Sequence, residues 1–371
     1  MTRTSRAKRL VPALIAGGAL ALTAALPAAA AAKVKLPKSG VETPTSGTVS
    51  ETGSSLLYPL FNLWVPGYNG TYPQLTIQTA STGSGTGITD ASNGTADIGA
   101  SDAYLSTSEL QATPTLQNIP LAISAQLVTY DVPGVTAHLK LSGKLLSAIY
   151  QGKVTNWGDP KVAALNKGVT LPTLPIVTLH RADSSGDTFL FTSYLSKATP
   201  SGWGSTLSYN TTITWPKAPG ALAETGNSGM VSTCKTTPGC LAYVGISYLT
   251  QVLQDSLGYA QLQNASGRYI LPSQSSIAAE AASFADKTPK SGTISLIYGP
   301  AKAGYPIINY EYAIVDAKQS TASAAENIRS VLEWAVNPKF GNASTYLEPV
   351  NFQPLPGKVE TSSIAQILKI K

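Results

Sequence analysis

The sequence predicts an α/β protein of about two domains, and three observations lead to this. Its 371 residues are enough for two hydrophobic cores. Three predicted strands, at residues 75–78, 95–101 and 175–179, each end in a segment rich in Ser, Gly or Asp, and helical patterns follow two of them. Two longer strand-like runs, at 120–131 and 305–315, are candidates for chain crossings between the domains. The composition, with only 12% charged residues, is typical of a folded chain.

The N-terminus has the pattern of an export signal. Four basic residues precede an apolar run at 10–26, and the alanines at 28–32 resemble a peptidase cleavage site, so we expect residues 1–32 to be a signal peptide. An uncleaved membrane anchor is the alternative, because the run approaches the length of a membrane span. No Cys follows the run to receive a lipid anchor. Residues 33–47, rich in Lys, Pro, Ser and Thr, are expected to form a flexible lead-in.

Removing the signal segment changes what the charge implies. The whole chain has a formal net charge of +6, but residues 1–32 hold four basic and no acidic residues, which leaves 22 basic against 20 acidic residues. A mature net charge of +2, with no basic run elsewhere, gives no reason to expect nucleic acid or a membrane surface as a partner.

The remaining helices and strands follow from hydrophobic spacing. A turn at 53–55 precedes a helix predicted at 56–64, in which Pro59 is tolerated only in the first turn. The segment at 224–231 begins another helix, and 241–244 has the pattern of a buried strand. Amphipathic or alanine-rich patterns predict further helices at 142–150, 161–166, 276–285 and 324–336.

The stretch at 180–194 carries the strongest functional signal. It begins after the predicted strand at 175–179 and leads into a helix predicted at 188–195. The residues between them are Arg181, Asp183, Ser184, Ser185 and Gly186. Free N–H groups at a helix start, two hydroxyls and one guanidinium together form an anion site. The alternative is an ordinary helix start, with Ser184 and Asp187 as a capping box and the arginine on the surface.

A second strand-to-helix junction contains the loop Gly83-Ser-Gly-Thr-Gly. It lacks the glycine spacing of a dinucleotide loop and the Gly-Lys-Ser/Thr ending of a nucleotide P-loop, so it does not indicate nucleotide binding. What remains is a set of backbone N–H groups with the Ser84 and Thr86 hydroxyls, again suited to an anion. Asp102 follows the strand at 95–101, and ligands of open α/β sheets bind at such carboxyl ends.

The two cysteines, Cys234 and Cys240, are close in sequence and flank a Pro-Gly pair that would turn the chain. In an exported protein such a pair favours a disulfide. A metal site is the alternative, but neither a His nor a further Cys lies nearby, so we expect no metal.

Four segments taken together resemble one protein family. They are Thr52-Gly-Ser-Ser-Leu, Gly83-Ser-Gly-Thr-Gly, Asp97-Ile-Gly-Ala-Ser-Asp-Ala and Arg181-Ala-Asp-Ser-Ser-Gly. In this order they are similar to the ligand-binding segments of the periplasmic phosphate-binding proteins, the substrate-binding components of phosphate ABC transporters. The resemblance extends over almost the whole mature chain.

The resemblance implies a fold as well as a ligand. The fold is the two-lobe, periplasmic-binding-protein-like α/β fold of type II, in which two chain crossings join the lobes and the ligand lies in a cleft between them. Residues 48–122 plus 306–371 would form lobe I, and residues 123–305 would form lobe II.

The resemblance also implies which residues bind phosphate. Ser55 and the backbone amide of Leu56 match the first segment, although the family usually has Phe in place of this leucine. Asp102 matches the aspartate that accepts a hydrogen bond from the anion, and Asp183 matches the charge partner of the binding arginine. The residues implied to contact phosphate are Ser55, Leu56, Ser84, Asp102, Arg181, Ser185 and Gly186.

Physical chemistry agrees with the role of Asp102. Phosphate near neutral pH carries a proton, whereas sulfate does not. An ionised, buried Asp102 would accept a hydrogen bond from phosphate but would face sulfate with acceptor against acceptor. Leaving a buried charge unpaired in this way costs roughly 1–3 kcal/mol or more, which discriminates against sulfate.

One position in the site departs from the family pattern. Directly after Ser185 and Gly186 the family commonly has Thr, and this chain has Asp187. Acidic residues suit the first turn of a helix, so we expect Asp187 to cap the helix through its first amides and to face away from the anion. If it faced the anion instead, affinity would fall, or the preference would move to a more protonated phosphate or another ligand.

These expectations lead to one function and two alternatives. The expected function is an exported, monomeric, non-catalytic solute-binding protein that captures inorganic phosphate for a phosphate ABC permease and needs no cofactor. A secreted phosphate-ester hydrolase is the first alternative, but a triad would need His138 or His180 beside a nucleophile, and no Gly-x-Ser-x-Gly elbow is present. The second is a released, non-transport relative used for scavenging, signalling or adhesion.

Overall fold

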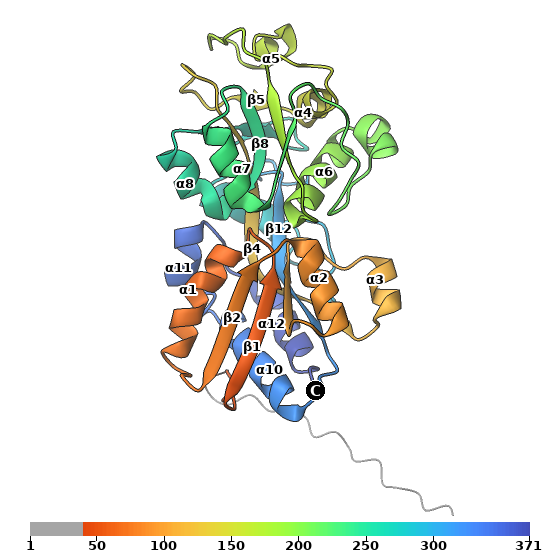
Figure 1. Ribbon diagram of the computed structural model, residues 1–371, viewed down its shortest axis with the longest axis vertical. Helices are drawn as coiled ribbons and strands as arrows, with labels where there is room; N and C mark the ends of the chain where they lie inside the picture. Colours follow the sequence, from red (N-terminus) through yellow and green to blue (C-terminus); the bar gives the residue numbers. More distant parts are fainter. Residues whose placement is uncertain (1–39) are drawn as a thin grey trace, which may run out of the picture. The chain divides into compact units, whose positions relative to one another are not determined.

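The structure, a computed structural model, describes residues 40–371. The predicted signal peptide at 1–32 and residues 33–39 of the predicted lead-in lie outside the described residues. The described part is an α/β fold whose elements form two lobes, one above the other along the vertical axis of Figure 1. The expected two-lobe fold is therefore confirmed.

Lobe I combines the N-terminal and C-terminal parts of the described chain. Its elements are β1 (Gly47–Gly53), α1 (Tyr58–Asn69), β2 (Leu75–Ser81), α2 (Ser84–Asn93), β3 (Ile98–Ser101), α3 (Thr107–Ala112), β12 (Ile308–Asp316), α10 (Ala322–Val336), α11 (Ser344–Leu347) and α12 (Gly357–Ile367). β1 pairs in parallel with both β2 and β3, so these strands end at the same edge of the sheet. Pro59 falls in the first turn of α1, where its missing N–H costs no hydrogen bond.

Lobe II is built from the middle of the chain. Its elements are β5 (Lys140–Leu141), α4 (Gly143–Tyr150), α5 (Pro160–Leu165), β6 (Val177–Arg181), α6 (Gly186–Ala198), β7 (Leu222–Glu224), α7 (Gly226–Lys235), β8 (Cys240–Gly245), α8 (Leu249–Gln254), β9 (Gly258–Tyr259), β10 (Gln261–Gln263), β11 (Tyr269–Ile270) and α9 (Gln274–Ala282). β6 pairs in parallel with β7 and with β8. As a result, α6 and α7 both begin at one edge of this half of the sheet.

Two long strands join the lobes. β4 (Leu116–Tyr130) pairs antiparallel with β12 over residues 116–125 and with β8 over residues 126–130. Within the described residues the main sheet therefore has the order β2-β1-β3-β12-β4-β8-β6-β7, with β9 paired to β4. Figure 1 shows β4 and β12 running from the lower group of elements into the upper one. They match the crossings predicted at 120–131 and 305–315.

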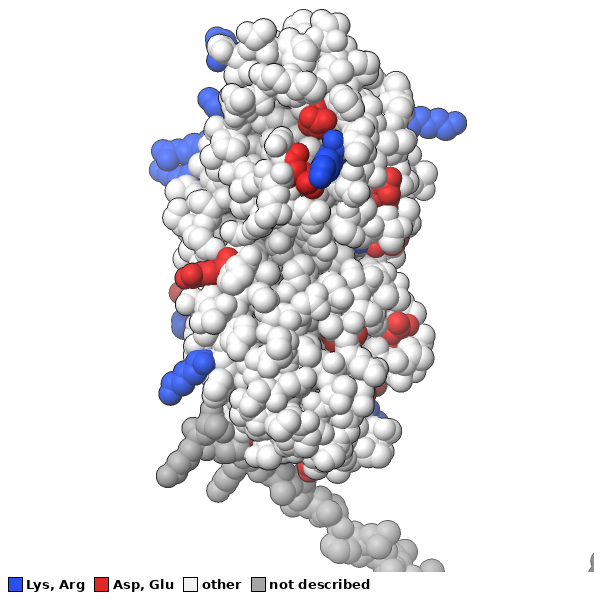
Figure 2. Space-filling view, turned by 60° about the vertical axis from the view of Figure 1, so that its left-hand side comes forward, with Lys and Arg blue, Asp and Glu red and all other residues white. Residues whose placement is uncertain are grey.

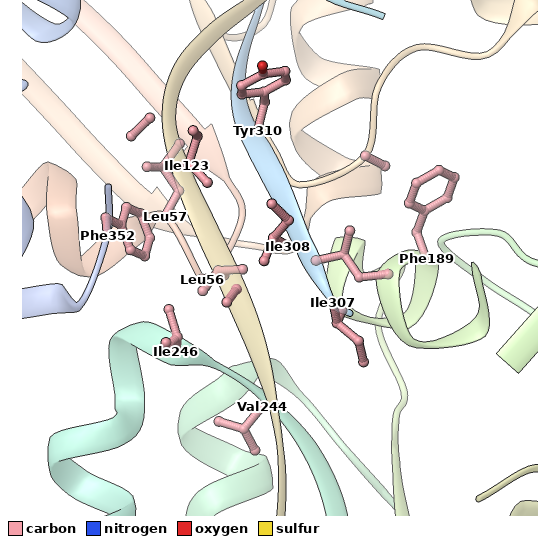
Figure 3. Packing of buried hydrophobic residues seen from close by; sticks show 14 of the residues in the cluster. Leu56, Leu57, Ile123, Phe189, Val244, Ile246, Ile307, Ile308, Tyr310 and Phe352 are labelled. Carbon is pink, nitrogen blue, oxygen red and sulfur yellow. The ribbon is translucent and has the colours of Figure 1, made fainter. Parts of the chain in front are cut away.

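The hydrophobic core continues from one lobe into the other along these crossings. Leu56 and Ile123 belong to the same buried cluster as Val244 and Ile246 of lobe II. Figure 3 shows these side chains gathered around the backbone of β4. Every residue of β4 after Gln117 is buried, which explains why its apolar residues do not alternate regularly with polar ones.

Residues 40–53 differ from the sequence prediction. The described part of the predicted flexible lead-in packs against α10, with the Val41 side chain buried and the Glu42 carboxylate bound to both Nε and Nη2 of Arg329. β1 follows it and is a strand that hydrophobic spacing did not predict. Its sequence is rich in Gly, Ser and Thr, but it pairs on both sides, and sheet pairing rather than side-chain hydrophobicity determines its conformation.

Cys234 and Cys240 form the expected disulfide, and both residues are fully buried between α7 and β8. None of the described helices combines the length and the apolar character that crossing a membrane requires. On the face drawn in Figure 2, charged side chains are few and scattered among uncharged ones, as a composition with 12% charged residues implies.

Candidate functional site

Four helix N-termini from both lobes meet at the junction of the lobes. α1 and α2 begin after strands β1 and β2 of lobe I, and α6 and α7 begin after strands β6 and β7 of lobe II. Contacts across the junction hold them together: the Gly85 amide donates to the Ser184 carbonyl at 3.0 Å, and the Asn227 amide donates to Ser55 Oγ at 3.2 Å. The free N–H groups of helix N-termini favour negative charge.

Arg181 ends β6 and is 4% exposed. Its Nε donates to Asp183 Oδ1 at 2.7 Å, its Nη2 donates to Asp183 Oδ2, and its Nη1 donates to Asp187 Oδ2 at 3.0 Å. Burial alone would lower the pKa of Arg181, but the two carboxylates raise this pKa above its ordinary value. These bonds use three of the five guanidinium N–H groups and leave two for a ligand.

Asp187 contacts Arg181 rather than the first amides of α6, so the expectation that it caps this helix is wrong. The N-cap of α6 is Ser185, whose Oγ accepts from the Thr188 amide at 3.4 Å. The Asp187 side chain is fully buried and accepts from three donors: Arg181, Gln126 Nε2 at 3.0 Å and Asn227 Nδ2 at 2.7 Å. Donors from other strands and helices therefore outcompete the first-turn amides for this carboxylate. The capping box of Ser184 and Asp187, which was the alternative to an anion site, does not form.

Asp102 lies directly after β3 and is 2% exposed. Ser54 Oγ donates to its Oδ1, and its own amide donates to Ser84 Oγ at 3.2 Å. Burial and the negative charge of Asp187 raise the pKa of Asp102, whereas hydrogen bonds from Glu311 and Ser54 and the charge of Arg181 lower it, and the net result is a pKa of about 7. The Ser54 hydroxyl just before α1 thus donates to the carboxyl group, and the Ser84 hydroxyl at the start of α2 accepts from the backbone amide of Asp102.

Gly186, the first residue of α6, approaches Asp102 from the opposite lobe. A Cβ atom at this position would lie 2.3 Å from Asp102 Oδ2 and 2.4 Å from Ser84 Oγ. No side chain fits there while the lobes are in contact. The glycine therefore allows the N-terminus of α6 to approach the aspartate directly.

Ser55 and Leu56 connect the start of α1 to lobe II. Ser55 Oγ accepts from Asn227 Nδ2 at 2.9 Å, and the Leu56 amide donates to Ser54 Oγ at 3.1 Å. The Leu56 carbonyl accepts from Ser247 Oγ at 2.8 Å. The leucine side chain packs against Gly245, so its apolar character is used in the contact between the lobes rather than in polar chemistry.

All the residues predicted for the site lie in this one region, and sequence reasoning missed several others that complete it. Asn227, at the start of α7, donates hydrogen bonds to both Ser55 and Asp187. Its place near a predicted helix start is the one sequence feature that could have indicated this role. Gln126 and Glu311 are buried polar residues in the crossing strands β4 and β12, and polar residues in such buried strands indicate an internal partner.

Comparisons with known proteins agree with this architecture. A family model described as a PBP superfamily domain matches residues 39–339. The phosphate-binding protein PstS of Xylella fastidiosa (strain 9a5c) is 30% identical over 309 residues, covering 83% of this chain and 81% of that protein. PstS of Pasteurella multocida (strain Pm70) is 30% identical over 314 residues, covering 84% and 87%.

Solved structures show the same fold. A high-affinity periplasmic phosphate-binding protein called PfluDING, solved with phosphate bound, superposes with a TM-score of 0.69 at 20% identity, covering 86% of this chain and 93% of that one. A phosphate-binding protein from Stenotrophomonas maltophilia superposes with a TM-score of 0.68 at 21% identity, covering 86% and 94%. The chain belongs to the PBP superfamily and, within it, to the family of the phosphate-binding proteins PstS.

Proposed function

We propose that this protein is an exported solute-binding protein that captures inorganic phosphate between its two lobes and delivers it to a phosphate ABC permease. The observation that carries the proposal is the arrangement of buried Asp102 and buried Arg181 at four converging helix N-termini. Asp102 would accept a hydrogen bond from the protonated oxygen of phosphate, and Arg181 would bind a negatively charged oxygen. The helix N-termini would supply further N–H donors. The names of its PstS relatives point to the same ligand.

The charges of the site suit an anion only when the helices are included. One positive side chain, Arg181, lies among three carboxyl groups, Asp102, Asp183 and Asp187. Each helix N-terminus contributes roughly half a positive elementary charge, and four of them offset the excess of carboxylates. Binding would therefore depend on aligned dipoles and hydrogen bonds more than on ionic attraction.

The proposed ligand contacts are those implied by the family pattern. Hydroxyl or amide groups of lobe I and lobe II would enclose the anion, Asp102 would accept a hydrogen bond from its O–H group, and Arg181 would donate hydrogen bonds from its two remaining N–H groups. Asp183 and Asp187 would hold the guanidinium in place and moderate its charge. The proposed contact residues are Ser55, Leu56, Ser84, Asp102, Arg181, Ser185 and Gly186.

The surroundings of the two histidines support a role without catalysis. The His180 ring packs on Trp215 with 5.0 Å between centroids, and the His138 ring packs on Tyr259 at 4.3 Å. Neither histidine is hydrogen-bonded to a serine of the site, as a general base would be. In the part of the chain from residue 40 onward, no group of three His, Cys, Asp or Glu residues could hold a metal ion.

Calorimetry on residues 33–371, unfolded and refolded to remove bound ligand, tests the proposal. Phosphate should bind with 1:1 stoichiometry, and an excess of sulfate should not compete. Absent phosphate binding by a correctly refolded chain would refute the assigned ligand while leaving the fold intact. Turnover of a chromogenic phosphate ester that disappears in Ser84→Ala would instead support the hydrolase alternative.

A further inference from the structure

Glu311 is a buried carboxyl group next to Asp102 that the family pattern does not assign. It lies in β12 and is fully buried. The register between β12 and β4 shifts between Glu311 and Tyr312, opposite Pro120, which has no N–H for the sheet. The extra residue at this bulge is Leu121 of β4. Tyr312 pairs with Ser101 at the end of β3, so the glutamate lies close to Asp102, the next residue along.

One oxygen of Glu311 has donors and the other faces a carboxylate. Oε1 accepts from Ser124 Oγ and from Asn309 Nδ2, the latter at 3.0 Å. Oε2 is buried and has no donor partner among the described residues. The side chain is instead in hydrogen-bonding contact with Asp102. Two ionised carboxylates cannot share such a contact, so one of them must carry a proton.

The donors around the pair indicate which group holds the proton. Asp102 accepts from Ser54 Oγ and lies in the field of Arg181, both of which favour its ionised form. Glu311 also has donors, Ser124 and Asn309, but burial and the charge of Asp102 outweigh them and raise the pKa of Glu311 well above its ordinary value. The contact between the two groups itself lowers the pKa of Asp102 and raises that of Glu311. The proton between the two groups therefore belongs on Glu311.

We propose that Glu311 is a specificity-determining positioning residue: its protonated carboxyl group donates to Asp102 and keeps that aspartate an obligatory hydrogen-bond acceptor. The inference rests on the proposed phosphate function. An acceptor at Asp102 recognises an oxyanion that carries a proton. If Asp102 lost the Glu311 donor, it would bind a proton more readily and become a donor itself. A protonated Asp102 no longer excludes sulfate.

The pH dependence of binding follows from the groups that face the pair. These are Asp187 on α6, Arg181 on β6 and Tyr312 on β12. When Glu311 loses its proton at alkaline pH, the pair gains a second negative charge next to the anion, and phosphate affinity falls. A glutamine at this position keeps the donor but cannot ionise, so it separates the hydrogen bond from the titration.

The test compares wild type, Glu311→Gln and Glu311→Leu in the refolded chain by calorimetry with phosphate and sulfate between pH 5.5 and 9.5. Glu311→Gln should retain phosphate affinity within about threefold at pH 7, reject sulfate, and lose less affinity than wild type at alkaline pH. Glu311→Leu should bind phosphate about tenfold or more weakly at pH 7 and should bind sulfate at the acidic end. Glu333→Gln, at a buried carboxyl on α10, is the matched control and should follow wild type.

The outcomes separate this inference from the proposed function. If wild type binds no phosphate, both fail together. If wild type binds phosphate and Glu311→Gln has the same pH profile as wild type, the glutamate has only a structural role and this inference is overturned. That comparison stands even if Glu311→Leu does not fold, because the glutamine preserves the size and hydrogen bonds of the side chain.

Discussion

Adding one methyl group at Gly186 would test whether phosphate binding requires the lobes to be in contact at this residue. Gly186→Ala should weaken phosphate binding by about a hundredfold, because the new Cβ would collide with Asp102 Oδ2 and Ser84 Oγ when the lobes are in contact. The thermal stability of the ligand-free chain should change little, since the lobes can separate slightly. Gly357→Ala is the control: it also lies at the start of a helix, and its Cβ would meet no atom within 4 Å. Equal affinity in both variants would contradict the closed arrangement.

Asp187 adds a negative charge where the family commonly has a hydroxyl. Asp187→Asn should bind phosphate several-fold more tightly at pH 8, because a charge next to the anion is removed while acceptors for Arg181 and Asn227 remain. Gln126 can turn its amide to match the new side chain, since its Oε1 is buried without a donor. Calorimetry of the two chains at equal ionic strength measures the change. Weaker binding would instead mean that phosphate binds as the dihydrogen anion and that Asp187 accepts a hydrogen bond from its second O–H group.

Single residues also show which parts of the site could be predicted from the sequence and which could not. Arg181, Asp183 and Asp102 could be predicted because their motifs are local, each following a strand within a few residues. The orientation of Asp187 could not, because a first-turn acidic residue has a good local partner and the winning donors, Gln126 and Asn227, come from β4 and α7. Glu311 was equally out of reach, since its contact with Asp102 depends on the register of β12 against its neighbours.

At the scale of elements, strands followed by helices were predictable where the sequence alternates or carries a helical pattern, as for β2, β6 and α10. The bounds and the order of pairing were not, because β3, β12 and β4 are neighbours in the sheet although β12 lies about two hundred residues further along the chain. The long apolar sequences of β4 and β12 did predict the crossings, since strands covered on both faces have no polar side.

The short turn at Ile246–Tyr248 offers a test of the contact between elements away from the ligand groups. Ser247 Oγ donates to the Leu56 carbonyl at the start of α1 across the lobe junction. Ser247→Ala should weaken phosphate binding by about fivefold, because a hydrogen bond that is present only in the closed form is lost. Thermal stability without ligand should stay constant. Ser232→Ala, at an exposed position of α7, should change neither quantity, and a similar loss in both variants would contradict the explanation.

The molecule as a whole buries several carboxyl groups that hold their protons. Burial raises the pKa of Glu51 to about 8 and the pKa values of Glu280 and Glu333 to about 7. In the unfolded chain the same groups release their protons near their ordinary pKa values. Between these limits the folded state binds more protons than the unfolded state, so stability falls as the pH rises.

Glu51 isolates this effect from ligand binding. Its Oε2 accepts from Thr79 Oγ1, while Oε1 is buried without a donor, so the ionised form is poorly solvated in β1. Its contribution disfavours folding increasingly from about pH 4.5 to about pH 8 and, at about 1.4 kcal/mol per pKa unit, reaches roughly 5 kcal/mol above that range. Glu51→Gln should therefore raise the melting temperature of the ligand-free chain at pH 9 and leave it unchanged at pH 5. Melting curves across this range, with the exposed Glu348→Gln as control, measure the difference. A stabilisation that is equal at both pH values would mean that Glu51 is already ionised in the folded chain, held by bonds stronger than the one to Thr79.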